Sequence, residues 1–300
     1  LIWVADTSYV TSGTCGENLI WALDNTGTLT IAGTGPMDDY SEWNVYAPWY
    51  SYKGRITTVR MEEGVTSIGV SAFEDCEKLT DVTIPQTVTT LGSSCFLSCS
   101  SLSHIELPDG ITVIPYEAFA HTGLTSINIP ELVTTIGSYA FKRCDYLTGV
   151  QIPAGVTSVG TYAFGYDKLK FVRFNGAAPT FGSQTFYNTK TTVFYPNYDS
   201  SWTAAVRQNY GGTVTWVSYQ KDHTEHSFDS NGLCSCGLVG GKCGASASWA
   251  LDPAAAQLTI SGTGAMTDYS SNTETPWVDY AASIRTVRVE EGITSLASCA

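Results

Sequence analysis

The sequence predicts a mainly β fold with short helical turns, arranged as a solenoid with a period of 22–23 positions. Two observations predict it. A short apolar run closed by proline recurs at spacings of 23, 22 and 23 positions, at Val82–Pro85, Ile105–Pro108, Ile127–Pro130 and Val150–Pro153. A phenylalanine recurs in the same phase, at Phe73, Phe96, Phe119, Phe141, Phe164 and Phe186. Self-similarity at a fixed period of this length is typical of stacked repeats.

The first expected element is a β-rich N-terminal cap over residues 1–55. Leu19–Leu23 alternates apolar and small residues, Asp24–Gly27 has the composition of a tight turn, and Leu29–Ile31 alternates again. This pattern predicts a β-hairpin. Repeat arrays need a cap over their first exposed core layer, and the hairpin precedes the first repeat.

Residues 56–190 are expected to form a solenoid of six coils. Alternating β-branched residues predict one strand per coil, stacked about 4.8 Å from the next strand. Proline ends each strand because it has no N–H to donate. The Ala-Phe pair lies in a stretch suited to one helical turn, and we expect the phenylalanines to point inward and stack as a continuous spine.

Cysteine recurs three positions after the phenylalanine in half of the coils, at Cys76, Cys99 and Cys144, and other coils carry Thr or Asp there. We expect this thiol to be a small buried filler rather than part of a disulfide. The chain has nine cysteines, an odd number scattered over 300 residues. Some of them must therefore be free or paired elsewhere.

These motifs resemble the BspA-type leucine-rich repeat family of bacterial surface proteins. Ile-Pro, Val-Thr-x-Ile-Gly and Ala-Phe-x-x-Cys carry the resemblance, at Ile84–Cys99 and Ile129–Cys144. Pro115, Cys95 and the decayed last copy at Pro179–Phe186 depart from the pattern. The resemblance implies a leucine-rich-repeat solenoid and an extracellular role in adhesion, but it does not identify a ligand.

A C-terminal cap is expected at residues 191–220. Ser200–Tyr210 combines capping residues with apolar residues at helical spacing, which predicts a short amphipathic helix. Thr213–Tyr219 then resembles a strand. The Gly, Ser, His and Cys content of residues 221–242 is typical of a connector between modules.

Residues 243–300 repeat the head of the chain. Cys15-Gly16 recurs as Cys243-Gly244, and Pro48-Trp49 recurs as Pro276-Trp277. The segment is therefore predicted to be a second copy of the cap and the start of a further repeat array. We expect the chain to be one complete module and the head of another, within a longer tandem array.

Composition narrows the classes of partner. The net charge is −13, which repels nucleic acids and anionic lipid surfaces. No apolar run approaches the roughly 20 residues of a membrane-spanning helix. Leu1–Val4 lacks the basic lead and length of a signal peptide, so we expect the chain to begin after a processed leader or at a boundary within a longer sequence. The extracellular or cell-surface location, as a mature segment, is what the family resemblance implies.

No catalytic or cofactor-binding constellation is evident. The chain contains no Gly-x-Ser-x-Gly motif, and Gly33-Thr34-Gly35 does not continue as a dinucleotide fingerprint. His104 and Glu106 share one face of a strand, and a surface pair is favoured over a catalytic one. Glu62 and Glu63 are adjacent, so they point to opposite faces and cannot flank one glycosidic bond. We therefore expect a non-enzymatic protein without a cofactor.

A zinc site in the connector is considered and disfavoured. His223, His226, Cys234 and Cys236 include Cys-x-Cys, which departs from the Cys-x-x-Cys spacing that suits tetrahedral zinc. A disulfide that involves Cys234, Cys236 or Cys243 is preferred in an oxidising compartment. No metal site is therefore expected.

The candidate binding residues are outward-pointing side chains of the stacked strands, because alternate strand residues point to opposite faces. They are Asp81, Thr83, His104, Glu106, Ser126, Asn128, Gln151 and Arg173. The alternative is an aromatic platform at the cap, at Trp43, Tyr46 and Trp49, on which a sugar ring could stack. Core packing is the competing interpretation of these aromatic residues, since Pro-Trp recurs in both heads.

Together these features predict a non-enzymatic bacterial binding or adhesion protein, secreted or displayed at the cell surface. Its solenoid would engage an extracellular protein or glycoprotein from a host or another microbe. A carbohydrate-binding module for nutrient capture, with a glycan as its partner, is the alternative.

Overall fold

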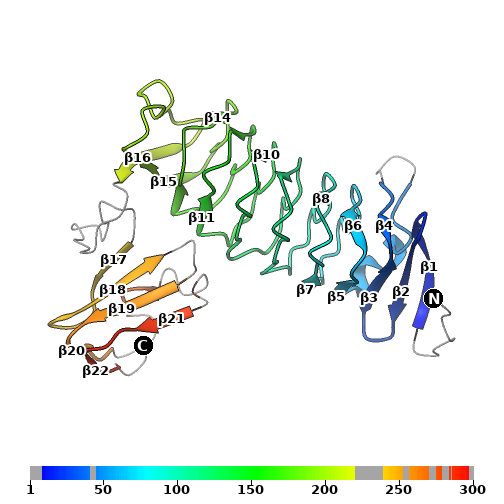
Figure 1. Cartoon of the computed structure of the whole chain (residues 1–300), viewed down its shortest axis with the longest axis horizontal. Coiled ribbons are helices and arrows are strands. Elements are labelled where there is room, and N and C mark those ends of the chain that lie inside the picture. Colours follow the sequence, from blue (N-terminus) through cyan, green and yellow to red (C-terminus); the bar gives the residue numbers. More distant parts are fainter. Residues whose placement is uncertain are drawn as a thin grey trace.

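The computed structural model describes residues 9–40, 45–219, 239–252, 257–269, 275–278, 284 and 286–296. The first module is a mainly β solenoid whose coils stack along one long axis, with the N-terminal cap at one end (Figure 1). The predicted fold class is confirmed. The cap contains strands β1 (Tyr9–Gly16), β2 (Leu19–Asp24), β3 (Thr28–Gly33) and β4 (Gly35–Pro36), and the 3-10 helix η1 (Tyr50–Arg55).

The cap begins with the expected hairpin. Strands β1, β2 and β3 pair antiparallel, and β3 then pairs parallel with β5 (Thr58–Met61), the first strand of the repeats. At the turn, the Asp24 carboxylate accepts hydrogen bonds from the N–H groups of Thr26 and Thr28 at 2.8 and 2.9 Å. Gly27 has a φ of +90°, and a Cβ there would lie 2.4 Å from the Arg55 carbonyl oxygen, so glycine is required.

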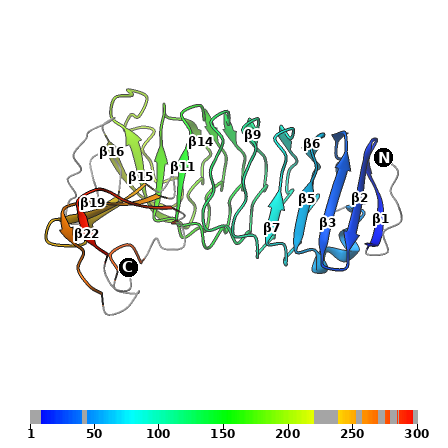
Figure 2. The ribbon, with the colours of Figure 1, turned by 60° about the horizontal axis from the view of Figure 1, so that its bottom comes forward.

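Parallel strands form two ladders along the repeats, and each ladder is divided into two sheets (Figure 2). The longer strands are β5, β7 (Asp81–Thr83), β11 (Gly149–Ile152), β13 (Phe171–Phe174), β15 (Lys190–Pro196) and β16 (Thr213–Tyr219). The shorter ones come from the Val-Thr-x-Ile segments and are β6 (Val65–Ile68), β8 (Thr90–Leu91), β9 (Val113–Ile114), β10 (Thr135–Ile136), β12 (Ser158–Val159) and β14 (Thr180–Phe181). The sequence predicted one strand per coil, and most coils contribute two.

The longer ladder is interrupted in the middle of the solenoid. Residues 104–107 and 126–129 form no strand, so β7 and β11 belong to different sheets. Ile105 and Ile127 are nevertheless buried, as their phase predicts. The expectation of one regular sheet is therefore wrong at these two coils. The spacing between Ile105 and Ile127 is 22 positions, one fewer than the spacings on either side.

The phenylalanine spine is confirmed. All six rings are fully buried, and successive rings stack with centroids 5.3–6.0 Å apart. Trp49 extends the stack into the cap, because its ring lies 5.7 Å from that of Phe73. The Trp49 indole N–H donates to the carbonyl oxygen of Ala72 at 2.8 Å. The spine therefore joins the cap to the repeats in one core.

The turn that carries each phenylalanine forms a third set of contacts between coils. In the first coil, the N–H groups of Ser71, Phe73 and Asp75 donate to carbonyl oxygens of the next coil at 2.9, 2.9 and 2.8 Å. The intervening N–H groups donate three positions back within the coil. The expected helical turn thus takes the form of separate tight turns. Ser71 and Asp75 have positive φ, 51° and 57°, and so do the corresponding residues of the later coils, except Gln184 in the last.

The thiols of the repeats are buried and free, as expected. Burial raises the pKa of Cys76 to about 12. The thiols of Cys99 and Cys144 each donate to the phenylalanine carbonyl oxygen of the preceding coil, both at 3.1 Å. In the last coil the Thr189 hydroxyl makes the same contact at 2.7 Å, to Phe164. Cys and Thr therefore make the same contact in these three coils, whereas Asp167 occupies the position in the fifth coil as an acceptor for the Cys144 N–H.

The C-terminal cap differs from expectation, because Ser200–Tyr210 forms turns and no helix. The segment instead continues the path of the coils. Phe186 and Asn188 donate their N–H groups to the carbonyl oxygens of Tyr210 and Gly211, both at 3.1 Å, as they would to a further coil. Trp202 packs on the last core layer, and its indole N–H donates to Gly176 at 3.0 Å. The predicted strand is confirmed as β16.

The second module repeats the topology of the cap. Its strands are β17 (Val239–Lys242), β18 (Ala247–Asp252), β19 (Gln257–Gly262), β20 (Gly264–Ala265), β21 (Thr286–Val289) and β22 (Ile293–Ser295). The order β17-β18-β19-β21 matches β1-β2-β3-β5. Trp249 and Trp277 meet edge to face at 6.0 Å, as Trp21 and Trp49 do at 5.7 Å.

Candidate binding surfaces

The strand face denotes the outward side chains of the longer ladder and of the two coils that interrupt it. It contains two columns. One comprises Thr58, Asp81, His104, Ser126, Gly149 and Phe171, and the other comprises Arg60, Thr83, Glu106, Asn128, Gln151 and Arg173. Between them, the inward residues of each strand, such as Val82 and Val150, are buried.

The first half of the strand face is open to solvent. Asp81, Thr83, Glu106 and Asn128 are exposed. His104 and Glu106 form the expected pair, with Nε2 and Oε1 3.5 Å apart, and the Glu106 side chain is 88% exposed. The two exposed carboxylates, Asp81 and Glu106, outnumber the exposed guanidinium of Arg60 in this half, and the core uses none of these side chains.

The second half of the strand face is partly closed. Ser126 is only 8% exposed, so its inclusion among the accessible residues was wrong. Phe171 is buried, and its ring occupies the space above Gly149, where a Cβ would lie 2.0 Å from a ring carbon. Phe171, Phe194 and Tyr219 form a separate small apolar cluster on this side.

Arg173 and Gln151 remain half-buried beside that cluster. The Arg173 guanidinium lies 4.3 Å from the centroid of the Tyr219 ring, a cation–π contact. The cluster thus holds Arg173 in place, whereas Gln151 has no such anchor among the described residues. The structure brings Asp81, Thr83, His104, Glu106 and Asn128 into one accessible region and separates Arg173 from it.

The aromatic cap is mostly core. Trp49 is 0% exposed within the spine, so it cannot serve as a platform residue, and the packing interpretation holds for it. Trp43 lies outside the described residues. Tyr46 is 53% exposed and stacks on Tyr50 with centroids 4.3 Å apart. The platform therefore reduces to Tyr46 and its supporting neighbour.

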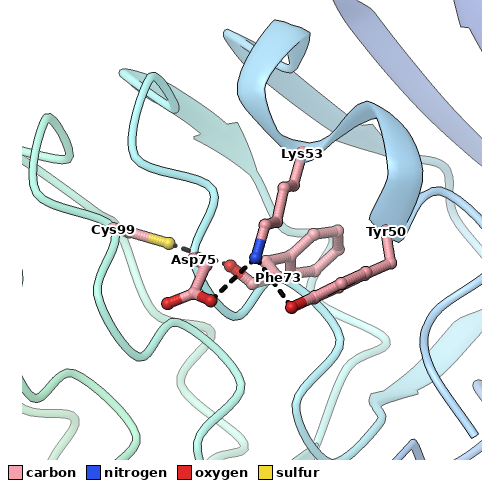
Figure 3. A network of polar contacts seen from close by, with 5 residues as sticks. All are labelled: Tyr50, Lys53, Phe73, Asp75 and Cys99. Atoms are coloured by element: carbon pink, nitrogen blue, oxygen red, sulfur yellow. Dashed lines mark hydrogen bonds and ion pairs between the residues drawn. The ribbon is translucent and has the colours of Figure 1, made fainter.

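A polar contact fixes this part of the cap to the first coil (Figure 3). The Lys53 ammonium donates to the Asp75 carboxylate at 2.8 Å and to the Tyr50 hydroxyl at 2.7 Å. These contacts raise the pKa of Lys53, although partial burial opposes them. The same ammonium lies 3.9 Å from the Tyr50 ring centroid. Lys53 therefore orients Tyr50 beneath the exposed ring of Tyr46.

Metal and redox sites receive no support from the part of the chain that the structure describes. It contains no cluster of three His, Cys, Asp or Glu side chains that could hold a metal ion. The zinc candidates His223, His226, Cys234 and Cys236 lie outside the described residues. Cys243 is described, and its thiol is buried and free, so the expected disulfide does not involve it. Among the described helices, none has the length and hydropathy to cross a membrane.

Sequence reasoning missed a column of tyrosines on the turn side of the coils. Tyr116, Tyr139 and Tyr162 recur at the period of the repeats, and Tyr166 and Tyr187 join them in the structure. The 23-residue interval between Tyr116, Tyr139 and Tyr162 could have predicted the column, but the strand motifs indicated only the side chains of the strands.

Comparison with known proteins agrees with the fold. The family described as BspA type Leucine rich repeat region matches residues 46–170, in six copies. No curated protein matches the chain. A leucine-rich repeat protein from Eubacterium ventriosum ATCC 27560 is 20% identical, with 95% of this chain and 86% of that chain covered and a TM-score of 0.42.

Two further solved structures are similar. The leucine-rich repeat protein of T. pallidum is 24% identical, with 56% of this chain and 84% of that chain covered and a TM-score of 0.42. A leucine-rich cell surface protein from Faecalibacterium prausnitzii A2-165 is 17% identical, with 96% and 97% covered and a TM-score of 0.26.

Proposed function

We propose that the protein, whose residues 46–170 match the BspA-type leucine-rich repeat family in six copies, is a non-enzymatic adhesion protein of the bacterial surface. It engages an extracellular protein or glycoprotein of a host or another microbe through the open half of its strand face. The family's repeat architecture supports a binding role, because stacked coils present long, preorganised surfaces.

The exposed polar set at Asp81, Thr83, Glu106 and Asn128 is the observation that carries this proposal. These side chains project from consecutive coils whose inward neighbours are buried, so the core fixes their spacing. A partner that docks there meets a preformed surface and orders few side chains of its own, which favours affinity.

The charge of this surface favours a partner with basic groups. Asp81 and Glu106 lie in neighbouring coils, and the chain as a whole carries −13. Complementary charge accelerates association and suppresses unsuitable partners. We therefore expect binding to weaken as the salt concentration rises.

A charge-reversal variant tests the proposal. The double variant Asp81→Lys/Glu106→Lys is expected to fold normally and to lose at least tenfold in affinity for cultured epithelial cells and immobilised matrix glycoproteins, measured with labelled protein. The matched control is Glu63→Lys/Glu77→Lys, which makes the same charge change at exposed turns. Equal binding by the two double variants would exclude the strand face.

Glycan capture for nutrition is the second candidate, and the exposed Tyr46 ring supports it. That ring stacks on Tyr50, whose hydroxyl accepts a hydrogen bond from the Lys53 ammonium, an arrangement suited to a sugar ring with a polar rim. The variant Tyr46→Ala is expected to reduce retention on a neutral glycan array, whereas Tyr198→Ala, equally exposed at 53%, is the control. Retention unchanged by Tyr46→Ala argues against this candidate.

A further inference from the structure

The tyrosine ladder denotes Tyr116, Tyr139, Tyr162, Tyr166 and Tyr187, on the turn side of the last four coils. Successive rings from Tyr116 to Tyr139 to Tyr162 to Tyr187 have centroids 5.5, 5.0 and 5.3 Å apart. Tyr166 lies 5.2 Å from Tyr187. The rings are partly or largely accessible, and none belongs to the hydrophobic core. They therefore form a second aromatic column, on the outside of the protein.

The coil geometry does not require these rings. Tyr139 and Tyr162 have φ values of 61° and 56°, and Ser71 and Ser94 occupy the same position of the first two coils with φ values of 51° and 56°. The left-handed region costs a residue other than glycine roughly 1–2 kcal/mol. Serine satisfies this position in coils of the same geometry. The tyrosines are therefore better explained by contact with something outside the chain.

Two cations accompany the ladder. The Lys142 ammonium lies 5.0 Å from the Tyr139 ring centroid and 5.9 Å from that of Tyr166. The Arg143 guanidinium lies 5.0 Å from the Tyr166 centroid. Among the described residues, neither cation forms an ion pair, so the aromatic rings hold both without neutralising them. The two charges remain available to an anion.

The segment that carries the tyrosine ladder is also less acidic than the rest of the chain. Residues 116–187 contain five Lys or Arg and four Asp or Glu, which leaves ten and 24 for the rest of the chain. One of the four acids, Asp167, is buried, and burial raises its pKa well above the usual value, which favours the neutral form. Partial burial and then the proximity of Lys142 and Arg143 lower the pKa of His121, against the opposing effect of Glu117 and Asp145. In a strongly acidic protein this segment is a local cationic region.

We propose that the tyrosine ladder, with Lys142 and Arg143, binds a linear acidic polysaccharide, which lies along the solenoid axis across several coils. Phenol rings offer apolar surface and edge hydroxyls, which suit the C–H faces and hydroxyl groups of sugar rings. The two cations select chains that carry carboxylates or sulfates. The surface, the ligand and its charge all differ from those of the strand face.

Matched polymers test the charge requirement. Polygalacturonate and dextran sulfate are the acidic probes, and methyl-esterified polygalacturonate and unmodified dextran are their neutral counterparts. The full chain is expected to bind at least one acidic polymer at least tenfold more tightly than its neutral counterpart in titration calorimetry. The difference is expected to shrink as salt is raised from low to physiological concentration.

Substitutions taken from the protein's own coils test the site. Tyr139→Ser/Tyr162→Ser, which copies the first two coils, is expected to weaken binding at least tenfold with folding intact. Lys142→Gln/Arg143→Gln is expected to remove the preference for the charged polymer. The control Tyr146→Ser/Tyr198→Ser removes two exposed rings outside the ladder, 64% and 53% exposed, and is expected to bind normally.

The outcomes separate the alternatives. No preference for either acidic polymer, or binding that survives Tyr139→Ser/Tyr162→Ser in a folded protein, overturns the proposal. Poly-L-glutamate that competes as well as the polysaccharide at equal charge also overturns it, because the ladder would then recognise an acidic peptide. The strand-face variant Asp81→Lys/Glu106→Lys is expected to retain polysaccharide binding, so this test and that of the adhesion proposal fail independently.

Discussion

Phe119 shows how each repeat places its phenylalanine in the core. Phe119 has no exposed surface, and Phe96 and Phe141 stack on its two faces at 5.7 and 5.6 Å. We expect Phe119→Ala to cost about 3–5 kcal/mol of unfolding free energy, as for other buried aromatic residues. Equilibrium denaturation measures this loss, and a value below about 1 kcal/mol would be incompatible with a buried ring.

Asp167 is a residue whose replacement should stabilise the protein. It occupies the position that Cys144 and Thr189 fill in adjacent coils, and its Oδ2 is buried without a hydrogen-bond partner. Burial raises its pKa well above the unfolded value of 3.8. Wild-type protein therefore loses stability as the pH rises from about 3.8 through the folded pKa.

Asp167→Thr copies the last coil and removes that loss. We expect the variant to be more stable than wild type by about 1–3 kcal/mol at pH 7, the cost of an unsatisfied buried polar group. Near pH 3 the carboxyl is protonated in both the folded and the unfolded state, so the advantage of the variant should be smaller than at pH 7. Paired denaturation curves across this range measure the difference, and an advantage that does not grow with pH contradicts the assignment.

Trp49→Phe separates the two roles of Trp49. The ring stack with Phe73 is retained, but the hydrogen bond to the Ala72 carbonyl oxygen is lost. A buried acceptor without its partner costs roughly 1–3 kcal/mol. Thermal unfolding of the variant measures the loss, and an unchanged melting temperature would mean that water replaces the indole N–H.

At the scale of elements, the sequence predicted those features that a repeated apolar pattern determines. The spine, the cap hairpin and the inward residues of the strands follow from periodicity and turn chemistry. The C-terminal cap does not, because Trp202 and Tyr210 have helical spacing but are held by the last coil. Tertiary contacts override local pattern there.

The exposure of the candidate surfaces was predicted only in part, for a related reason. Alternation identified which side chains of the strand face point outward, but it could not reveal that Phe171 and Tyr219 close its second half. These two residues come from β13 and β16, which are far apart in the sequence. The tyrosine ladder could not be predicted in full, because Tyr166 and Tyr187 occupy other positions of their repeats and meet the column through contacts between coils.

Trp202 is predicted to determine the stability of the C-terminal cap. It is 5% exposed, contacts Phe174 and Phe181 through its ring, and is anchored by its indole N–H. We expect Trp202→Ala to lower stability by about 3–5 kcal/mol. Hydrogen exchange should accelerate first in β15 and β16. Uniform acceleration along all coils would mean that the cap and the repeats unfold as one unit.

At the scale of the whole molecule, the described residues of the second module repeat a core layer that the coils of residues 69–219 cover in the first. Val59 and Ile68 are 0% and 1% exposed in the first module, and their counterparts Val287 and Leu296 are 56% and 59% exposed in the second. A cavity of about 290 Å³ opens there, lined by residues such as Ile260 and Trp277. In the first module the following coils cover this layer, which accounts for the lower exposed fractions of Val59 and Ile68.

A graft tests this interpretation. Residues 69–219, placed directly after Leu296, are expected to cover the layer as they do in the first module. Slower amide exchange in β19 and β21 and weaker binding of a hydrophobic dye should result. Unchanged exchange in these strands would show that the second head packs differently from the first.

The turns that carry the phenylalanines have an electrical direction of their own. In each of them the N–H groups that bond across coils at the phenylalanine and two positions to either side point toward the following coil, whereas N–H groups outside this run, such as those of Thr80 and Gly92, point toward the preceding coil. Peptide dipoles aligned in this way add rather than cancel, as they do along a helix. The turns therefore carry a moment along the axis of the array, negative toward the N-terminal cap, and the Trp49 indole acts at that end as a surrogate for an absent amide.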